Sequence, residues 1–262
     1  MELENLPYGL QTQTTYGAQV ALIEPGCWRL SIPEGPAGRY RLAQVDNTRA
    51  MKRSLFPYKA PWKMRLKARA SKSDLPGTWG FGVWNDPFGM AILTGKGVRL
   101  PQLPNAAWFF HASPQNYLSL WDDQPANGWL GATFRSPLLP SLLLMTAAPL
   151  LALMVLPAAA RLMRSMGRRH IQQSAIQLDL DPVGWHEFLL DWKTGAVILS
   201  VDGEILLKTA VSPLGRLGMV IWIDNQYAAF PPDGRVRYGL LANPEPAWIE
   251  IQSLNLEPES RA

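Results

Sequence analysis

A strict two-residue period is the feature that most constrains the fold of this chain. From Trp62 to Ala70, apolar residues at the even positions alternate without exception with lysine and arginine at the odd positions. Successive side chains of a β-strand point to opposite faces of its sheet, so this segment predicts a strand with one core face and one cationic face. The cationic row is more typical of an ordinary solvated sheet face than of a site for phosphate or anionic lipid.

The same period recurs along most of the chain, between turns rich in proline and glycine. The sequence contains 23 prolines and 21 glycines, and about a dozen further short segments alternate in this way, residues 118–121 among them. Asp202 and Gly203, between two apolar runs, are typical of a type I′ hairpin turn. A chain of 262 residues with 47% hydrophobic content therefore predicts one all-β domain over residues 1–262, folded as a two-sheet sandwich.

One segment departs from this pattern and predicts an insert in the sandwich. Residues 136–160 carry no charge, and a run of about 20 apolar residues is long enough to cross a bilayer. The run also contains Pro140, Pro149 and Pro157, each of which removes a backbone donor and breaks or kinks a helix. We therefore expect a broken, apolar helical hairpin over residues 136–170 and not a clean single span.

Basic residues follow the apolar run directly and indicate what it contacts. No acidic residue occurs between the run and Asp179, and a cluster of arginines suits the anionic headgroups of a cytoplasmic leaflet. We expect the insert to lie against an anionic membrane surface. The alternatives are an apolar lid over the protein's own cleft, a contact between the copies of a homo-oligomer, and a true span. The residues expected at the membrane are Leu143, Leu150, Leu153, Arg161, Arg164, Arg168 and Arg169.

Composition and motifs exclude several classes of function. The net charge of +4 is modest for a protein that binds nucleic acid. Cys27 is the single cysteine and the three histidines are scattered, so we expect neither a disulfide framework nor a transition-metal site. The chain has no phosphate loop, dinucleotide fingerprint or nucleophile elbow, and we expect no cofactor. Its start lacks the basic and apolar regions of a secretory signal, so we expect a cytoplasmic protein.

Two stretches together resemble a known family. Residues 185–192 read Trp-His-Glu-Phe-Leu-Leu-Asp-Trp and are followed by Val-Ile-Leu-Ser-Val-Asp-Gly at 197–203, while residues 77–84 read Gly-Thr-Trp-Gly-Phe-Gly-Val-Trp. These segments resemble strands of concanavalin A-like jelly rolls, in particular glycoside hydrolase family 16. The resemblance implies a jelly-roll sandwich with a ligand cleft and allows a structural calcium, whereas residues 136–170 lie outside it.

The sequence departs from this family at the catalytic strand. The resemblance implies a Glu-x-Asp-x-Glu strand that supplies a nucleophile and an acid/base, because a retaining glycosidase needs two carboxyl groups close together. Between Asp86 and Asp122 this chain has no acidic residue, and the corresponding segment reads Ala-Ala-Trp-Phe-Phe-His-Ala-Ser at 106–113. Standard retaining hydrolysis is therefore improbable.

Aromatic and polar residues that remain near the predicted cleft are the candidates for a site. Asp224 shares a strand face with Trp222 and could act as a general acid with a raised pKa, or cap a turn at the strand end. His111 is the one histidine on the predicted cleft strand, although such a residue is more often part of the core. The residues expected to bind ligand are Trp84, Trp108, Trp222, Gln226 and Tyr227, with core packing as the alternative for the tryptophans.

These features predict two classes of function. In the first, the jelly-roll cleft binds a hydrophobic or amphipathic small molecule at a membrane surface, an isoprenoid or a glycolipid for instance, and Asp224 or His111 catalyses its isomerisation, cyclisation or hydration. In the second, the chain is a carbohydrate-binding or diverged glycoside hydrolase-like domain whose tryptophans stack on sugars. The apolar insert and the missing catalytic motif favour the first class.

Overall fold

Two seven-stranded antiparallel sheets stack face to face in the computed structural model, which describes residues 6–49, 51–87, 99–123, 126–140 and 153–258. Sheet A consists, in spatial order, of β1 (Gln11–Thr15), β4 (Leu42–Asp46), β13 (Gly218–Asp224), β6 (Thr78–Trp84), β7 (Ala106–Ala112), β8 (Gly128–Arg135) and β9 (Gln172–Gln177). Sheet B consists of β12 (Glu204–Thr209), β11 (Ala196–Val201), β10 (His186–Lys193), β5 (Trp62–Ala70), β16 (Ala247–Pro258), β3 (Cys27–Ile32) and β2 (Gln19–Glu24). The predicted all-β, two-sheet sandwich is confirmed.

The main core lies between the two sheets. The even-numbered residues of β5 are all buried there, as its alternation predicted. Phe188 of sheet B packs edge-to-face on Phe81 and Phe109 of sheet A, with 5.0 Å between the ring centroids of each pair. Such aromatic contacts contribute packing energy beyond the area that they bury, so they hold the middle of the sandwich together.

The cationic face of β5 is an outer surface of sheet B. Arg65 lies 3.3 Å from Glu187, and Arg69 lies 2.7 Å from the buried carboxylate of Glu250. Acidic residues on the neighbouring strands thus compensate part of the positive charge of this row of lysine and arginine side chains. The arrangement agrees with an ordinary sheet face.

Two local predictions have different outcomes. The hairpin turn between β11 and β12 is confirmed, since Asp202 and Gly203 have φ values of 50° and 85°, and a type I′ turn requires positive φ at both positions. Residues 118–121 do not form the predicted strand. Backbone carbonyls of this segment accept hydrogen bonds from an arginine side chain in place of a neighbouring strand.

Within the described residues, the insert contributes one short 3-10 helix and one α-helix. The short 3-10 helix η3 (Leu153–Val155) precedes α4 (Pro157–His170), and Pro157 begins α4 because proline is tolerated in the first helical turn. The rest of the predicted hairpin, residues 141–152, lies outside the described residues. No helix in the described part of the chain is long and apolar enough to cross a membrane.

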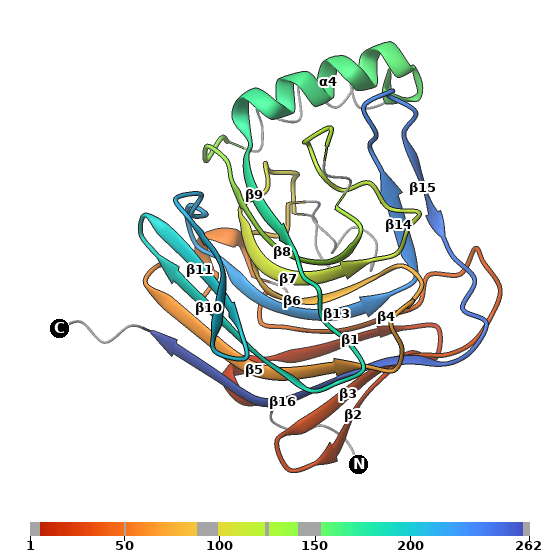
Figure 1. Cartoon of the computed structure of the whole chain (residues 1–262), viewed down its shortest axis with the longest axis vertical. Coiled ribbons are helices and arrows are strands. Elements are labelled where there is room, and N and C mark those ends of the chain that lie inside the picture. Colours follow the sequence, from red (N-terminus) through yellow and green to blue (C-terminus); the bar gives the residue numbers. More distant parts are fainter. Residues whose placement is uncertain (1–5, 50, 88–98, 124–125, 141–152, 259–262) are drawn as a thin grey trace.

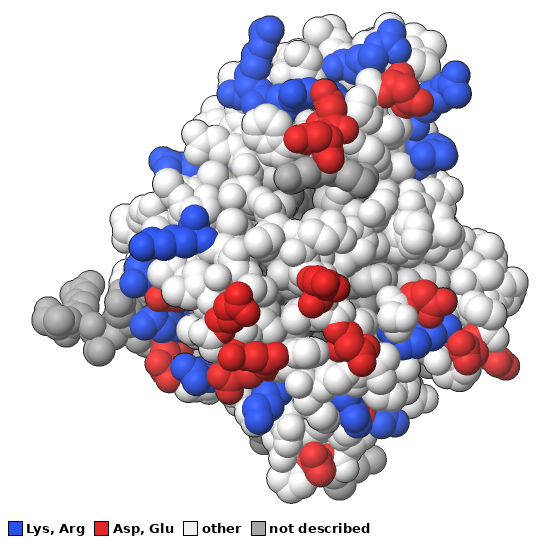
Figure 2. All heavy atoms as spheres, viewed as in Figure 1, with Lys and Arg blue, Asp and Glu red and all other residues white. Residues whose placement is uncertain are grey.

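The concave side of sheet A faces α4, while its convex side faces sheet B (Figure 1). The hairpin of β14 (Gln226–Ala229) and β15 (Arg237–Leu240) rises beside sheet A toward the beginning of α4. In the same view, lysine and arginine predominate over the α4 end of the molecule (Figure 2). The helix therefore forms an outer layer above the concave face.

Candidate functional site

The concave face of sheet A is opposite the inter-sheet core. On β13, Ile221 and Ile223 belong to that core, so Val220, Trp222 and Asp224 point to the concave side. Residues that pair directly across neighbouring strands point to the same side of the sheet, so the register identifies the other side chains on this face. Its side chains include Gln13, Leu42, Gln44, Asp46, Val220, Trp222, Asp224, Thr78, Trp84, Trp108, Phe110, Leu130 and Phe134.

Trp222, Trp108 and Trp84 form one aromatic cluster on this face, which we call the tryptophan platform. The ring centroids of Trp222 and Trp108 are 5.7 Å apart, and those of Trp84 and Trp108 are 6.3 Å apart. Because β6 lies between β13 and β7, the backbones that carry Trp222 and Trp108 are about 10 Å apart. Gly80 and Gly82 of β6 leave room for the rings to meet, since a Cβ at Gly82 would lie 2.5 Å from that of Trp108.

Asp224 lies at the edge of the platform in a network of hydrogen bonds. Its Oδ1 atom accepts from the hydroxyl and backbone N–H of Thr78, at 2.9 and 3.2 Å, and from the backbone N–H of Gln226 at 3.3 Å. The hydroxyl of Tyr40 donates to Oδ2 at 3.2 Å. The indole N–H of Trp222 donates to the Thr78 hydroxyl at 2.9 Å, which joins the carboxylate to the platform.

Burial changes the acidity of both groups at this edge. Desolvation raises the pKa of Asp224 to about 6, although the hydrogen bonds that it accepts oppose the change. Burial, together with the nearby charge of Asp224, raises the pKa of Tyr40 well above its ordinary value. At neutral pH Tyr40 therefore keeps its proton and acts as a donor, while Asp224 is mostly an acceptor.

Several donors on this face have no acceptor within the described residues. The indole nitrogens of Trp84 and Trp108 and the amide nitrogen of Gln13 are buried, and none has a hydrogen-bond partner there. Buried polar groups in native proteins are almost always hydrogen-bonded, so unpaired donors call for an explanation. The indole nitrogens of Trp62, Trp79 and Trp129 in the inter-sheet core are also without a partner among the described residues, so this property is not specific to the concave face.

Sheet A strands carry two carboxylates, Asp46 and Asp224, and both point to the concave side. Asp46 pairs with Val220, four residues from Asp224, so the two carboxyl groups are separated by roughly 13 Å of strand. Retaining glycosidases need about 5 Å and inverting ones less than about 10 Å. Asp46 also accepts hydrogen bonds from Gln44 and Thr48, which tie it to its own strand.

No group of three or more His, Cys, Asp or Glu side chains in the described part of the chain could hold a metal ion.

His111 lies on the other face of sheet A from the tryptophan platform. Its ring stacks on Trp79 at 6.0 Å and meets the edge of Trp129 at 6.5 Å, inside the sandwich. Burial lowers the pKa of His111 to about 4, so the ring is neutral near pH 7. We predicted that His111 would share a site with Asp224, but the sheet separates them, because positions 108 and 111 of one strand have opposite parity.

Gln226 and Tyr227 lie just beyond the end of β13. Gln226 contributes its backbone N–H to Asp224. Tyr227 is the second residue of β14, in the hairpin that leaves sheet A, and its ring covers Gly239 of β15. Of the predicted site residues, the structure thus brings together Trp84, Trp108, Trp222 and Asp224.

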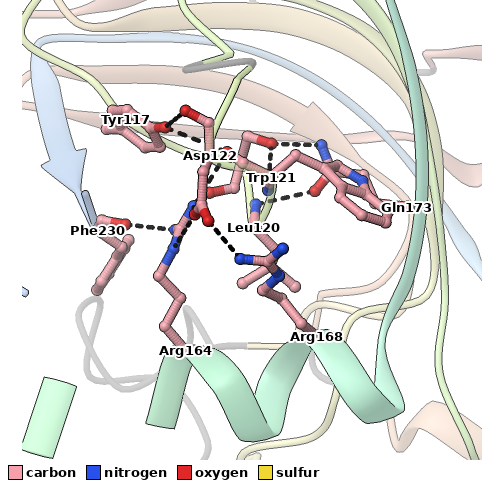
Figure 3. Close-up of polar contacts among 9 residues, drawn as sticks. Tyr117, Leu120, Trp121, Asp122, Arg164, Arg168, Gln173 and Phe230 are labelled. Carbon is pink, nitrogen blue, oxygen red and sulfur yellow. Dashed lines mark hydrogen bonds and ion pairs between the residues drawn. The ribbon is translucent and has the colours of Figure 1, made fainter. Parts of the chain in front are cut away.

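Arg164 is buried inside the molecule, although we predicted that it would contact a membrane. Its guanidinium donates to the carbonyls of Ser119 at 2.7 Å, Trp121 at 3.0 Å and Phe230 at 2.5 Å, and forms an ion pair with Asp122 at 3.0 Å (Figure 3). The side chain is 7% exposed. Arg164 therefore fixes α4 to the loop of residues 117–123 and to the end of the β14–β15 hairpin.

The other predicted membrane residues have varied positions. Arg168 is partly exposed and pairs with Asp122 at 2.6 Å. Leu153, Arg161 and Arg169 are exposed. Leu143 and Leu150 lie outside the described residues.

Tyr40, Thr78, Gly80 and Gly82 are the site residues that we did not single out from the sequence. The alternation of residues 77–84 gave a signal for three of them, because Thr78, Gly80 and Gly82 share a face with Trp84. Tyr40 gave none. It lies 184 positions before Asp224, and only the pairing of β4 with β13 brings them into contact.

No family model matches the chain, and no curated protein does either. Solved structures are similar to it in fold at low identity. A β-glucanase of Bacillus licheniformis is 10% identical over 96% of this chain and 94% of its own, with a TM-score of 0.48. A sialidase is 9% identical over 96% of this chain, with a TM-score of 0.46, and the binding domain of botulinum neurotoxin DC is 9% identical over 94%, with a TM-score of 0.43. The chain spans 17% of the sialidase chain and 42% of the neurotoxin chain.

Proposed function

We propose that the concave face of sheet A binds a carbohydrate. The observation that carries the proposal is the tryptophan platform with a hydrogen-bonded carboxylate at its edge. Trp222 and Trp108 are half-buried and form a continuous aromatic surface. Aromatic rings stack on the apolar faces of sugar rings, and a few polar groups beside them fix the orientation of the ligand.

The polar groups on this face match the hydroxyls of a sugar. Oδ2 of Asp224 accepts from Tyr40 and retains capacity for a further donor, such as a sugar hydroxyl. A purely apolar ligand would offer no donor to this carboxylate.

Binding without glycoside hydrolysis is the form of the proposal that we favour. The two carboxylates of the sheet A strands are too far apart for either glycosidase geometry. Asp224 then serves to bind and orient a hydroxyl.

A second candidate is a hydrophobic or amphipathic ligand, on which Asp224 acts as an acid. The apolar surroundings of the platform favour it, since Phe110, Leu130 and Phe134 cluster with Trp108 and Trp222. A carboxyl group with a pKa of about 6 is also suited to donate a proton near neutral pH. A lipid-linked glycan would combine both chemistries.

Calorimetric titration with β-glucan and galactan oligosaccharides tests the proposal. We expect Trp222→Ala to weaken binding at least tenfold, because the stacking surface is lost. Asp224→Asn should weaken binding several-fold and leave the fold intact. Trp185→Ala is the matched control, since this tryptophan lies beside Arg69 on the outer face of sheet B.

Equal loss in all three variants would point to a general effect on folding and would contradict the proposal. Lipid extraction of the purified protein with mass spectrometry distinguishes the candidates. A co-purified lipid without a glycan, together with no oligosaccharide binding, would favour the second candidate.

A further inference from the structure

Helix α4 is held in one orientation, which determines the face that it turns outward. Arg164 and Ala160 are buried on its inner side, and Gly167 lies close to Leu120 of the loop beneath. Arg161 adds a hydrogen bond to the carbonyl of Asp233, at 3.0 Å, near the tip of the β14–β15 hairpin. Both ends of the helix are therefore attached to the body of the protein, and its outer side is a fixed surface.

That outer side carries large apolar side chains among its polar ones. Val155, Leu162 and Met166 are 84%, 63% and 47% exposed. Leu162 and Met166 are four residues apart and lie on the same side of α4. Val155 belongs to η3, which precedes the helix. Leu153 and Leu156 extend the exposed apolar surface at the beginning of the helix. A contiguous apolar surface of this kind on a soluble domain marks a site of contact.

The same surface is bordered by positive charge. α4 contains Arg161, Arg164, Arg168 and Arg169 and no acidic residue, and its arginines other than Arg164 are exposed. Asp122 compensates Arg168 in part, whereas Arg161 and Arg169 have no ion pair among the described residues. Figure 2 shows lysine and arginine gathered over this end of the molecule.

We propose that the outer face of α4, together with η3, docks on an anionic lipid bilayer. An apolar row with arginines along its border is the pattern of a helix that lies in the plane of a membrane interface. The apolar side chains would enter the headgroup region, and Arg161 and Arg169 would face lipid phosphates. The proposal is independent of the carbohydrate proposal, which concerns the concave face of sheet A beneath the helix.

Charge favours a bilayer over a second copy of the chain. Two copies joined through this face would bring the same arginines together, and like charges in contact oppose association.

Sedimentation of the full-length protein with vesicles tests the proposal. We expect binding to vesicles of phosphatidylcholine with phosphatidylserine, weaker binding to phosphatidylcholine alone, and a decrease as salt is added. The double variants Leu162→Gln with Met166→Gln, and Arg161→Gln with Arg169→Gln, should each lower the partition coefficient at least tenfold.

Matched controls are available on the outer face of sheet B. Ile205→Gln removes an apolar side chain that is 60% exposed, and Arg65→Gln with Lys67→Gln removes two cations. Neither should change binding to vesicles. The proposal is overturned if the α4 variants bind vesicles as well as the wild type does, or if the wild type does not bind anionic vesicles. It is also overturned if light scattering shows a dimer that the α4 variants convert to monomer without any effect on lipid.

Discussion

At the scale of single residues, Asp224 and His111 lie on the two faces of one sheet, and their contributions to the stability of the fold depend on pH in opposite directions. The folded state raises the pKa of Asp224 from 3.8 to about 6, so it retains a proton that the unfolded chain loses. Its contribution to stability is present below pH 4 and is lost as the pH rises to 6. The pKa of His111 falls from 6.5 to about 4, so its contribution is present above pH 6.5 and is lost as the pH falls to 4.

We predict that single variants separate these two effects. Relative to the wild type, Asp224→Asn should gain stability as the pH rises from 4 to 6, by roughly 3 kcal/mol at most. His111→Phe should gain stability as the pH falls over the same range, by a similar amount. Urea unfolding at a series of pH values measures both differences.

A pH-independent difference for Asp224→Asn would mean that this carboxyl group is not desolvated in the folded protein. The same result for His111→Phe would place the imidazole in contact with solvent. The double variant should show the sum of the two curves, because the sheet lies between the residues and keeps them independent.

At the scale of elements, the position of α4 depends on one buried side chain. Arg164 satisfies the carbonyls of Ser119, Trp121 and Phe230, none of which belongs to a sheet. Removal of the guanidinium leaves the buried carbonyl of Ser119 without this donor, at a cost of about 1–3 kcal/mol, and also removes the bonds to Trp121 and Phe230. The helix and the loop beneath it should then separate before the sandwich unfolds.

We therefore predict that Arg164→Ala increases amide hydrogen exchange in residues 157–170 and 117–123, with little change in the strands of the two sheets. Arg168→Ala is the matched control, because Arg168 is partly exposed and pairs with Asp122 alone among the polar groups described. Similar exchange in the two variants would show that Arg164 does not anchor the helix.

At the scale of the whole molecule, the C-terminal strand lies in the middle of sheet B, beside a strand from the N-terminal part of the chain. The C-terminal strand β16 lies between β3 and β5 and pairs with both (Figure 1). It also carries Glu250, the buried acid that pairs with Arg29 and Arg69. Sheet B is complete only after the last strand of the chain has been synthesised.

We predict that truncation before Ala247 abolishes folding, because β3 and β5 lose their shared partner and two arginines lose a buried acid. Truncation after Pro258 should leave the thermal unfolding curve unchanged. Circular dichroism and solubility of the two proteins provide the measurement. If the protein truncated before Ala247 still unfolded cooperatively, sheet A together with α4 would form a unit that folds independently of β16.

The sequence by itself determined the local features of this protein. Alternation over Trp62–Ala70 predicted β5 and its buried face, and Asp202 with Gly203 predicted the turn of a hairpin. The apolar run predicted helical structure within residues 136–170, although Pro157 was expected to break a helix and instead begins α4. The spacing of Trp222 and Asp224 placed them on one face. All of these depend on residues close together in the chain, where the strand and helix periods act directly.

Only the tertiary structure decided which faces and segments meet. Strand β7 is apolar on both sides, so alternation could not tell which side of it faces the core, and the location of His111 followed from the packing of the sheets. The contact of Tyr40 with Asp224 and the burial of Arg164 depend on pairings across long stretches of chain. Such pairings follow from the strand order of the whole sandwich, which no local period contains.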